Sequence, residues 1–188
     1  MLKLAALPIG LLVLGMSRAD LTGTVTTSSG KPARFAVVFL EGSGLVVKPA
    51  PNVSIEQRGK QFIPHVLAVP IGTTVDFPNR DTVFHNVFAE FEAKKFDLGM
   101  YPRGSSRHQK FGRPGLVSLF CSVHSQMSAY IFVVDTPLYA VADVQGRFSI
   151  KCPAGDYRLK VWHESGEILR ETVQLAPSSQ RALRTSKL

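Results

Sequence analysis

Cysteine, histidine and methionine occur together in one short segment, Cys121-Ser122-Val123-His124-Ser125-Gln126-Met127. With 2 Cys, 5 His and 4 Met among 188 residues, a Cys-x2-His-x2-Met pattern would arise by chance in roughly one chain in a thousand. A thiolate, an imidazole and a thioether together suit copper better than other biological metals. A blue-copper site combines one thiolate with two imidazoles and a long axial thioether. The segment therefore predicts three copper ligands and requires a second imidazole from elsewhere.

The candidate for the second imidazole is His85, in the segment 75–88. Four motifs resemble the cupredoxin family, three before His85 and one that begins with it. They are Phe62-x-Pro64, Val69-x-x-Gly72-x-x-Val75, Phe77-x-Asn79-x-Asp81 and His85-Asn86. The short loop 121–127 is most similar to that of amicyanin. The segment Phe96-Asp97-Leu98-Gly99 adds a likeness to plastocyanin-like proteins of the methylamine-utilisation type. The resemblance covers about residues 51–135.

The cupredoxin resemblance implies one role for each candidate ligand. His85 would supply the upstream imidazole from a strand end, and Cys121 the thiolate. His124 would supply the second imidazole, and Met127 the weak axial thioether. In such a site a rigid β-scaffold holds both copper oxidation states in nearly one geometry, so that little reorganises when an electron moves.

The same resemblance implies that Asn86 binds Ser122, the hydroxyl residue after the cysteine, and so ties the two ligand segments together. One departure concerns the ligand loop. The amicyanin loop has prolines on both sides of its histidine, whereas this chain has Val123 and Ser125 there. The rigidity of the loop and the redox potential are therefore left open.

Each candidate ligand also has an alternative interpretation. Cys121 could be a buried thiol, Met127 could fill the core, and His124 could be a surface imidazole. Zinc also accepts cysteine and histidine, but methionine is a poor zinc ligand and a structural zinc site needs a fourth strong one. Cys152 follows an apolar alternation and is expected to be a buried thiol, neither a ligand nor a disulfide partner.

The other histidines have weaker functional signals. His65 and His163 are expected to be structural, and His108 lies in a basic stretch. The cations of this stretch are Lys94, Lys95, Arg103, Arg107, Lys110 and Arg113. It is either a solubilising face or an electrostatic guide for an acidic redox partner. Nucleic acid is not expected as a partner, because the chain has no clustered aromatic platform for stacking bases.

Strands must position these ligands. Apolar residues recur with period two between Gly, Pro, Asn and Asp turns, and no segment keeps a helical period for three turns. The predicted fold class is all-β, with a cupredoxin-like Greek-key β-sandwich apparently inserted into a second, smaller β-sandwich.

The insertion is suggested by the two ends of the chain. Residues 21–42 resemble the opening hairpin of a carboxypeptidase-regulatory-like or transthyretin-like β-sandwich. The expected continuation, an Asp-x-x-Gly-x-Phe turn and a Pro-x-Gly-x-Tyr-x-Leu strand, comes only at 143–148 and 153–159. Because each doubling of a loop costs only about 0.6 kcal/mol, an inserted domain is tolerated. We predict one module from 20–50 plus 136–176, a cupredoxin domain at 51–135 and a frayed basic tail at 177–188. Generic hairpin patterns are the alternative.

The first nineteen residues have the features of a secretory signal peptide. Lys3 is followed by an apolar stretch at 4–15, too short to span a bilayer, and by the small-x-small site Ser17-Arg18-Ala19. A retained N-terminal anchor is the alternative. Without Lys3 and Arg18, 20 basic residues face 14 acidic ones, so the formal charge falls from +8 to +6. No second stretch is apolar enough for a membrane helix, and the mature protein is expected to be periplasmic or extracellular.

The sequence therefore predicts an exported type 1 copper protein that shuttles single electrons between redox partners and is not an enzyme. A copper chaperone or scavenger, and an interaction protein with an incidental metal site, are the alternatives. Multicopper oxidase or nitrite reductase chemistry is disfavoured, because it needs further copper centres with paired His-x-His ligands and the sequence contains no such pair.

Overall fold

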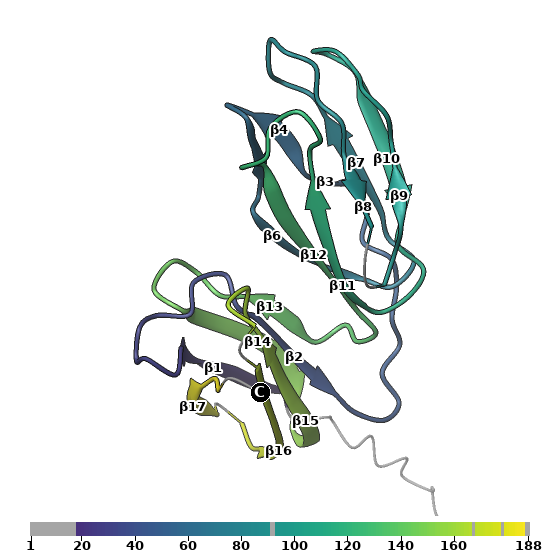
Figure 1. Cartoon of the computed structure of the whole chain (residues 1–188). Helices are drawn as coiled ribbons and strands as arrows, with labels where there is room; N and C mark the ends of the chain where they lie inside the picture. Colours follow the sequence, from purple (N-terminus) through teal and green to yellow (C-terminus); the bar gives the residue numbers. More distant parts are fainter. Residues whose placement is uncertain (1–17, 91–92, 167, 178, 187–188) are drawn as a thin grey trace, which may run out of the picture.

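The protein is described by a computed structural model in which residues 18–90, 93–166, 168–177 and 179–186 are placed (Figure 1). Within these ranges the chain forms strands β1 to β17 and no helix, which confirms the predicted all-β class. The expected leader falls on residues 1–19, of which 1–17 lie outside the described part. No helix among the described residues is long and apolar enough to cross a membrane.

Strands from the two ends of the chain form two sheets, which together we name the terminal sandwich. Its three-stranded sheet has the order β14-β1-β17, with β1 at Arg18–Thr26, β14 at Arg147–Pro153 and β17 at Gln180–Arg184. Its four-stranded sheet has the order β13-β2-β15-β16, with β2 at Val37–Glu41, β13 at Tyr139–Val141, β15 at Gly155–Trp162 and β16 at Ile168–Leu175. Alternate apolar residues of these strands, such as Leu21, Ile150 and Leu159, share one buried core.

The middle of the chain forms the central sandwich. Its five-stranded sheet has the order β6-β12-β11-β8-β9, with β6 at Val66–Pro70, β8 at Phe88–Ala89, β9 at Phe96–Asp97, β11 at Gly115–Phe120 and β12 at Ser128–Val134. Facing it is the sheet β10-β7-β3, with β3 at Val53–Ser54, β7 at Thr74–Pro78 and β10 at Ser106–Lys110. A hairpin of β4 at Glu56–Arg58 and β5 at Gln61–Ile63 completes it. A second core fills this sandwich.

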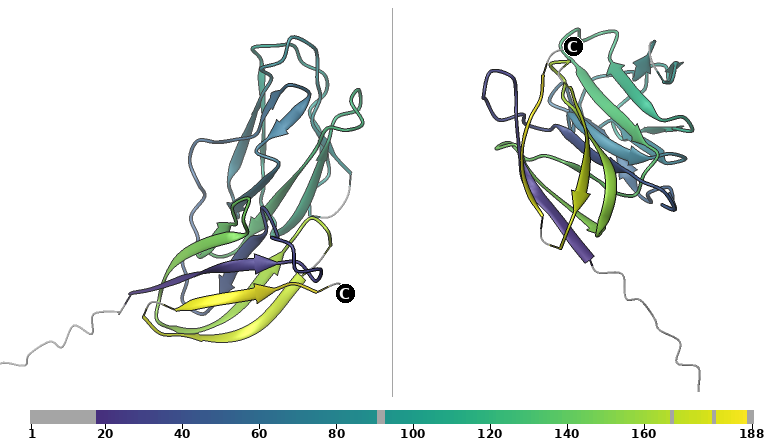
Figure 2. Two further views of the ribbon diagram at one scale, coloured as in Figure 1. Left: turned by 90° about the vertical axis from the view of Figure 1, so that its left-hand side faces the viewer. Right: turned by 90° about the horizontal axis from the view of Figure 1, so that it is seen from below.

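The two sandwiches pack against each other through one sheet of each (Figure 2). Phe39 of β2 contacts Phe132 of β12, with ring centroids 5.3 Å apart, and Trp162 of β15 meets Tyr130 of β12 at the same distance. Strand β2 is therefore apolar on both faces: Val37 and Phe39 face the central sandwich, while Val38 and Leu40 face the terminal core. This burial on both sides explains the unbroken apolar run at 36–40.

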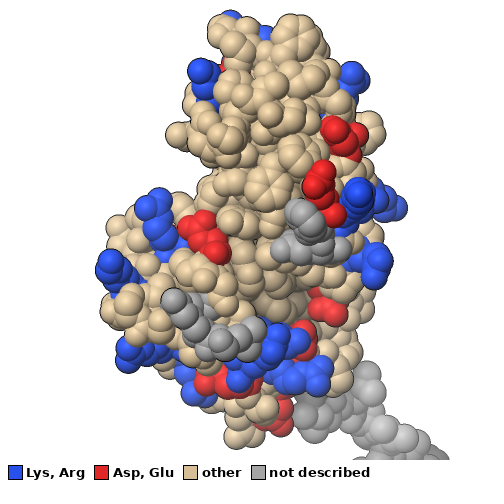
Figure 3. Space-filling view, viewed as in Figure 1, with Lys and Arg blue, Asp and Glu red and all other residues tan. Residues whose placement is uncertain are grey.

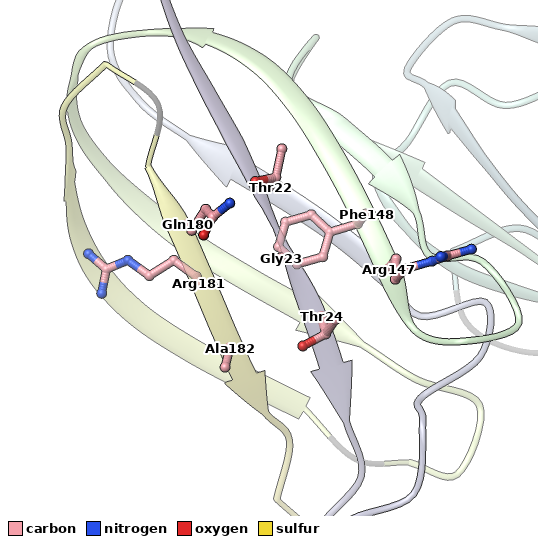
Figure 4. A pocket seen from close by; sticks show the side chains of 8 residues that line it. All are labelled: Thr22, Gly23, Thr24, Arg147, Phe148, Gln180, Arg181 and Ala182. Atoms are coloured by element: carbon pink, nitrogen blue, oxygen red, sulfur yellow. The ribbon is translucent and has the colours of Figure 1, made fainter.

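The expected frayed tail is wrong for residues 180–184, which form β17 parallel to β1. Leu183 is the reason, because it pairs with Val25 and is buried in the terminal core. Gly23 allows the close approach of the two strands: a Cβ there would lie 2.0 Å from the carbonyl oxygen of Arg181. Figure 4 shows the shallow hollow that these strands leave around Phe148.

Candidate metal centre

The candidate metal centre lies at the end of the central sandwich remote from the terminal sandwich, where β7 and β11 lead into two loops (Figure 1). His85 comes from the loop after β7 and is held by a short antiparallel bridge to Tyr101. The N–H of Tyr101 donates to the His85 carbonyl at 2.9 Å, and the N–H of His85 donates back at 3.3 Å. His85 is fully buried, so its ring direction is set by the core.

Cys121 directly follows β11, and His124 follows in a tight turn closed by a hydrogen bond from the N–H of Met127 to the His124 carbonyl at 2.9 Å. The Cys121 Sγ lies 3.8 Å from Nδ1 of His85 and 3.9 Å from Nδ1 of His124. The ligand atoms of the three residues all lie within 4.8 Å of one another. Two segments that are far apart in the sequence thus present one sulfur and two imidazole nitrogens to a common point.

Met127, the expected axial ligand, is buried in the same core as Cys121. It ends the ligand loop directly before β12. His124 differs from the others because it is only partly buried. Desolvation lowers the pKa of His124, and the nearby His85 and Lys60 lower it further. The imidazole of His124 therefore favours the neutral form that can bind a metal.

Asn86 joins the two ligand loops. Its Oδ1 accepts hydrogen bonds from the backbone N–H of Ser122 at 2.8 Å and from the Ser122 hydroxyl at 3.0 Å. Its Nδ2 donates to Asp97 at 3.3 Å, and the same Asp97 oxygen accepts from the N–H of Gly99 at 2.8 Å. The amide therefore ties the segment after His85 to the segment after Cys121 and to the end of β9.

Asp81 holds the far side of the His85 ring. Nε2 of His85 donates to Oδ2 of Asp81 at 2.7 Å, which leaves Nδ1 facing Cys121. The carboxylate also accepts from the backbone N–H groups of Gly59 at 2.6 Å and Lys60 at 2.8 Å. Burial by itself raises the pKa of Asp81, but these N–H groups and His85 outweigh it and lower the pKa. An ionised carboxylate thus fixes the ring and its tautomer, as outer carboxylates do for metal-bound histidines.

The sequence prediction did not assign Asp81 this role. In the sequence, the aspartate stands out only as the last residue of the Phe77-x-Asn79-x-Asp81 motif. The available signal was its position four residues before His85, but in a loop that spacing says nothing about where side chains point. The carboxylate reaches the ring because the turn between β4 and β5 supplies two N–H groups beside it.

A buried polar network supports the loop that carries His85. Nδ2 of Asn79, a fully buried residue, donates to the carbonyls of Val83 at 2.9 Å and Tyr101 at 3.0 Å. The Tyr101 hydroxyl donates to the Phe77 carbonyl at 2.9 Å and accepts from Gln57 at 2.5 Å. Burial raises the pKa of Tyr101 to about 12. These hydrogen bonds join the loop to β7 and to the segment around Tyr101, and so favour a single conformation of the loop, while Oε1 of the buried Gln57 has no partner among the described residues.

The donor set fits copper. Among the described residues, the group that could hold a metal contains one thiol and two imidazoles and no carboxylate. The nearest carboxylate, Asp81, already accepts three hydrogen bonds. A structural zinc site would want a fourth strong donor, whereas copper accepts the soft thioether that Met127 brings to the same core.

The other expected residues lie away from this centre. Cys152 is a free, buried thiol in the terminal core, and burial raises its pKa. His65 binds the Ser128 carbonyl at 3.1 Å and Glu164 at 2.6 Å, and so links the two sandwiches. His163 is buried, with Nδ1 2.8 Å from the Ser165 hydroxyl. His108 is exposed on β10.

Comparisons with known proteins give likenesses of fold. No protein-family model and no curated protein sequence matches the chain. Among solved structures, a purple cupredoxin from Nitrosopumilus maritimus is 23% identical over 44% of this chain and 100% of its own, with a TM-score of 0.41. An amicyanin point mutant in its reduced Cu(I) form at pH 4 is 16% identical over 52% of this chain and 98% of its own, with a TM-score of 0.42. A copper-containing nitrite reductase from Thermus scotoductus SA-01 is 24% identical over 58% of this chain and 28% of its own, with a TM-score of 0.43. These likenesses of fold to solved copper proteins cover 44%, 58% and 52% of this chain.

Proposed function

We propose that this protein is a type 1 copper protein that passes single electrons between redox partner proteins and catalyses no reaction of its own. The observation that carries the proposal is the convergence of Cys121 Sγ with Nδ1 of His85 and of His124 at 3.8 and 3.9 Å. Bound copper would supply the one-electron couple. His85, Cys121 and His124 would hold it, with Met127 as the axial donor.

The protein's own contribution is a site that changes little between oxidation states. Asp81 fixes the His85 ring, and Asn86 fixes the start of the ligand loop through Ser122. Cys121 is 4% exposed, so water is largely excluded from the sulfur. The hydrogen bonds between Ser122 and Asn86 would stiffen this loop in place of prolines, which are absent at positions 123 and 125. A rigid, dry site favours electron transfer over the release of copper that a chaperone or scavenger would need.

Electrons would enter and leave through His124. It is the one proposed ligand that is only partly buried. Large apolar side chains are exposed on both ligand loops, with Phe84 55% and Val123 53% exposed. Contiguous exposed apolar surface is typical of protein interaction sites, and we propose that these side chains contribute to one. A partner that covers these side chains would approach the edge of the His124 ring.

The test of this proposal is the visible spectrum of the purified protein after addition of Cu(II). An intense blue thiolate-to-copper band and a reversible one-electron wave in voltammetry are expected. Cys121→Ser should abolish the band, whereas the matched variant Cys152→Ala should keep it. Copper binding without the band would favour a chaperone or scavenger. No copper binding would favour an interaction protein with an incidental site.

We also propose that the chain is organised as one module interrupted by another, with 51–135 as the inserted cupredoxin domain. The separate cores of the terminal and central sandwiches support this division. Excising 51–135 and joining the ends with a short linker should leave a folded terminal sandwich, measured by cooperative thermal unfolding. An unfolded product would count against it.

The predicted leader at 1–19 supports export to the periplasm or the cell exterior.

A further inference from the structure

Three arginines line one hollow at the metal end of the central sandwich. They are Arg58 at the end of β4, Arg80 after β7, and Arg103 before β10, and Asn79 and Gly104 form the rest of the wall. The N–H of Gly104 donates to the Asn79 carbonyl at 2.9 Å, which holds the segment with Arg103 against the segment with Arg80.

The positive charge of this hollow is not balanced. Arg58 forms an ion pair with Glu56 at 3.1 Å. Arg80 and Arg103 form no ion pair with any described residue. The carboxylate next to Arg80 in sequence, Asp81, is directed at His85 and two backbone N–H groups. Two guanidinium groups therefore remain available to an anion from outside.

The hollow adjoins the proposed electron-transfer face. Asn79, which forms its wall, also binds the Val83 carbonyl with its side chain, and so belongs to the loop that carries His85. Val83 and Phe84 are the exposed apolar residues of that loop. The upper end of the molecule in Figure 3 is mostly uncharged, with Lys and Arg at its margin. An apolar surface with cations at one side fits a partner whose apolar surface has carboxylates at one side.

Most of the basic stretch lies at the other end of the central sandwich. In the β7–β10 pair, Lys110 lies opposite Thr74, at the end away from the metal centre. The N–H of Ala93, next to Lys94 and Lys95, donates to the Leu116 carbonyl near the start of β11, again at the remote end. Arg113 stands two residues before that start. Two cations of the stretch lie toward the metal end. Arg107, opposite Phe77 in β7, holds its guanidinium over the Tyr101 ring, 5.8 Å from the ring centroid, and does not line the hollow. Arg103 lines it together with Arg58 and Arg80, which that stretch did not include.

We propose that the hollow formed by Arg58, Arg80 and Arg103 is the docking site for carboxylate side chains of an acidic redox partner. Guanidinium groups bind carboxylates through paired, charge-assisted hydrogen bonds, which set orientation as well as attraction. The partner's carboxylates would seat in this hollow while its apolar surface covers Phe84 and Val123. The redox role of the bound partner rests on the proposed function, whereas the binding of carboxylates in the hollow does not.

The first experiment measures the rate at which the reduced, copper-loaded protein gives one electron to ferricyanide, which becomes ferrocyanide. The double variant Arg80→Gln/Arg103→Gln should lower the second-order rate constant by about 5- to 10-fold at low ionic strength, because local charge steers an anionic reactant. The loss should shrink as salt is added. The matched control Lys94→Gln/Arg113→Gln removes the same formal charge from the remote end and should change the rate less than 2-fold, roughly. Equal losses in both variants would overturn the proposal.

The second experiment needs no copper. Hexacyanochromate(III), a paramagnetic anion, is added to the metal-free, nitrogen-15-labelled full chain, and broadening of amide signals is mapped. Broadening centred on Arg80, Arg103 and Gly104 is expected, and its loss in Arg80→Gln/Arg103→Gln. Broadening centred on Lys94 and Arg113 would refute the docking site. Because this measurement is independent of the blue band, failure of the copper proposal and failure of the anion site are distinguishable.

Discussion

Replacing Asp81 by Asn tests how the protein fixes its metal centre. The carboxylate accepts three hydrogen bonds, from Nε2 of His85 and from the N–H groups of Gly59 and Lys60. An asparagine of nearly the same shape has only one acceptor oxygen. Its oxygen can serve His85 and Lys60, which both contact Oδ2, but its amide NH2 must then face the N–H of Gly59.

The expected loss of stability follows from this count. Hydrogen bonds to a charged group contribute about 1.5–3 kcal/mol, and neutral ones about 0.5–1.5 kcal/mol. In Asp81→Asn, one of the three hydrogen bonds is lost and the other two are made to an uncharged oxygen. Because the side chain is partly in contact with solvent, the metal-free protein should be destabilised by about 2–4 kcal/mol. Loss of the negative charge behind the His85 ring also favours the reduced form of bound copper, which raises the redox potential by on the order of 50–100 mV.

Two measurements check these values: urea denaturation of the metal-free protein and voltammetry of the copper-loaded one. The matched control is Asp143→Asn in the terminal sandwich. The Asp143 carboxylate also accepts three hydrogen bonds, from the N–H of Gln145 at 2.8 Å, and from the N–H and Nε of Arg147 at 2.9 and 2.7 Å. Because Asp143 lies far from the centre in the fold, this variant should leave the potential unchanged.

The reasoning would be refuted by one pattern in particular. If Asp81→Asn shifted the potential no more than Asp143→Asn while the blue band persisted, the carboxylate would act only on the loop and not on the His85 ring. A stability loss below about 1 kcal/mol would show that water replaces its hydrogen bonds.

Three further outcomes are expected. Asn86→Ala leaves the N–H and hydroxyl of Ser122 without their acceptor, so it should cost about 2–3 kcal/mol and speed copper removal by a chelator, measured by decay of the blue band. Tyr101 has its pKa raised to about 12 by burial, so the stability it contributes is complete below pH 10 and is lost as the pH rises toward 12; Tyr101→Phe should flatten this fall by about 2–3 kcal/mol in alkaline urea titrations. Trp162→Ala removes a ring between the two sandwiches and should cost about 2–3 kcal/mol without changing the visible spectrum, whereas a changed spectrum would show coupling between interface and metal centre.

The sequence predicted best where chemistry is local. Cys121, His124 and Met127 lie in one seven-residue loop, so their spacing alone suggests that they bind one metal ion. The period-two alternation predicted strands because strands such as β14 have one face in a core. The frayed tail was the failure: Leu183 is a weak local signal, and its partner Val25 is far away in the chain.

Residues that act across long separations needed the tertiary structure. Nothing in the sequence places the Gly59–Lys60 turn beside Asp81, or Arg58 beside Arg103. The apolar run of β2 did not by itself predict that this strand is buried on both faces, or that its second face covers Phe132.

The sequence by itself predicted the candidate ligand types, the metal they suit and the all-β class, because donor chemistry and strand alternation belong to neighbouring residues. Only the tertiary structure decided which ring nitrogen of His85 faces the thiol, which carboxylate holds that ring and where the arginines of the hollow gather. These depend on strand register and loop packing, which bring together groups that the chain keeps far apart.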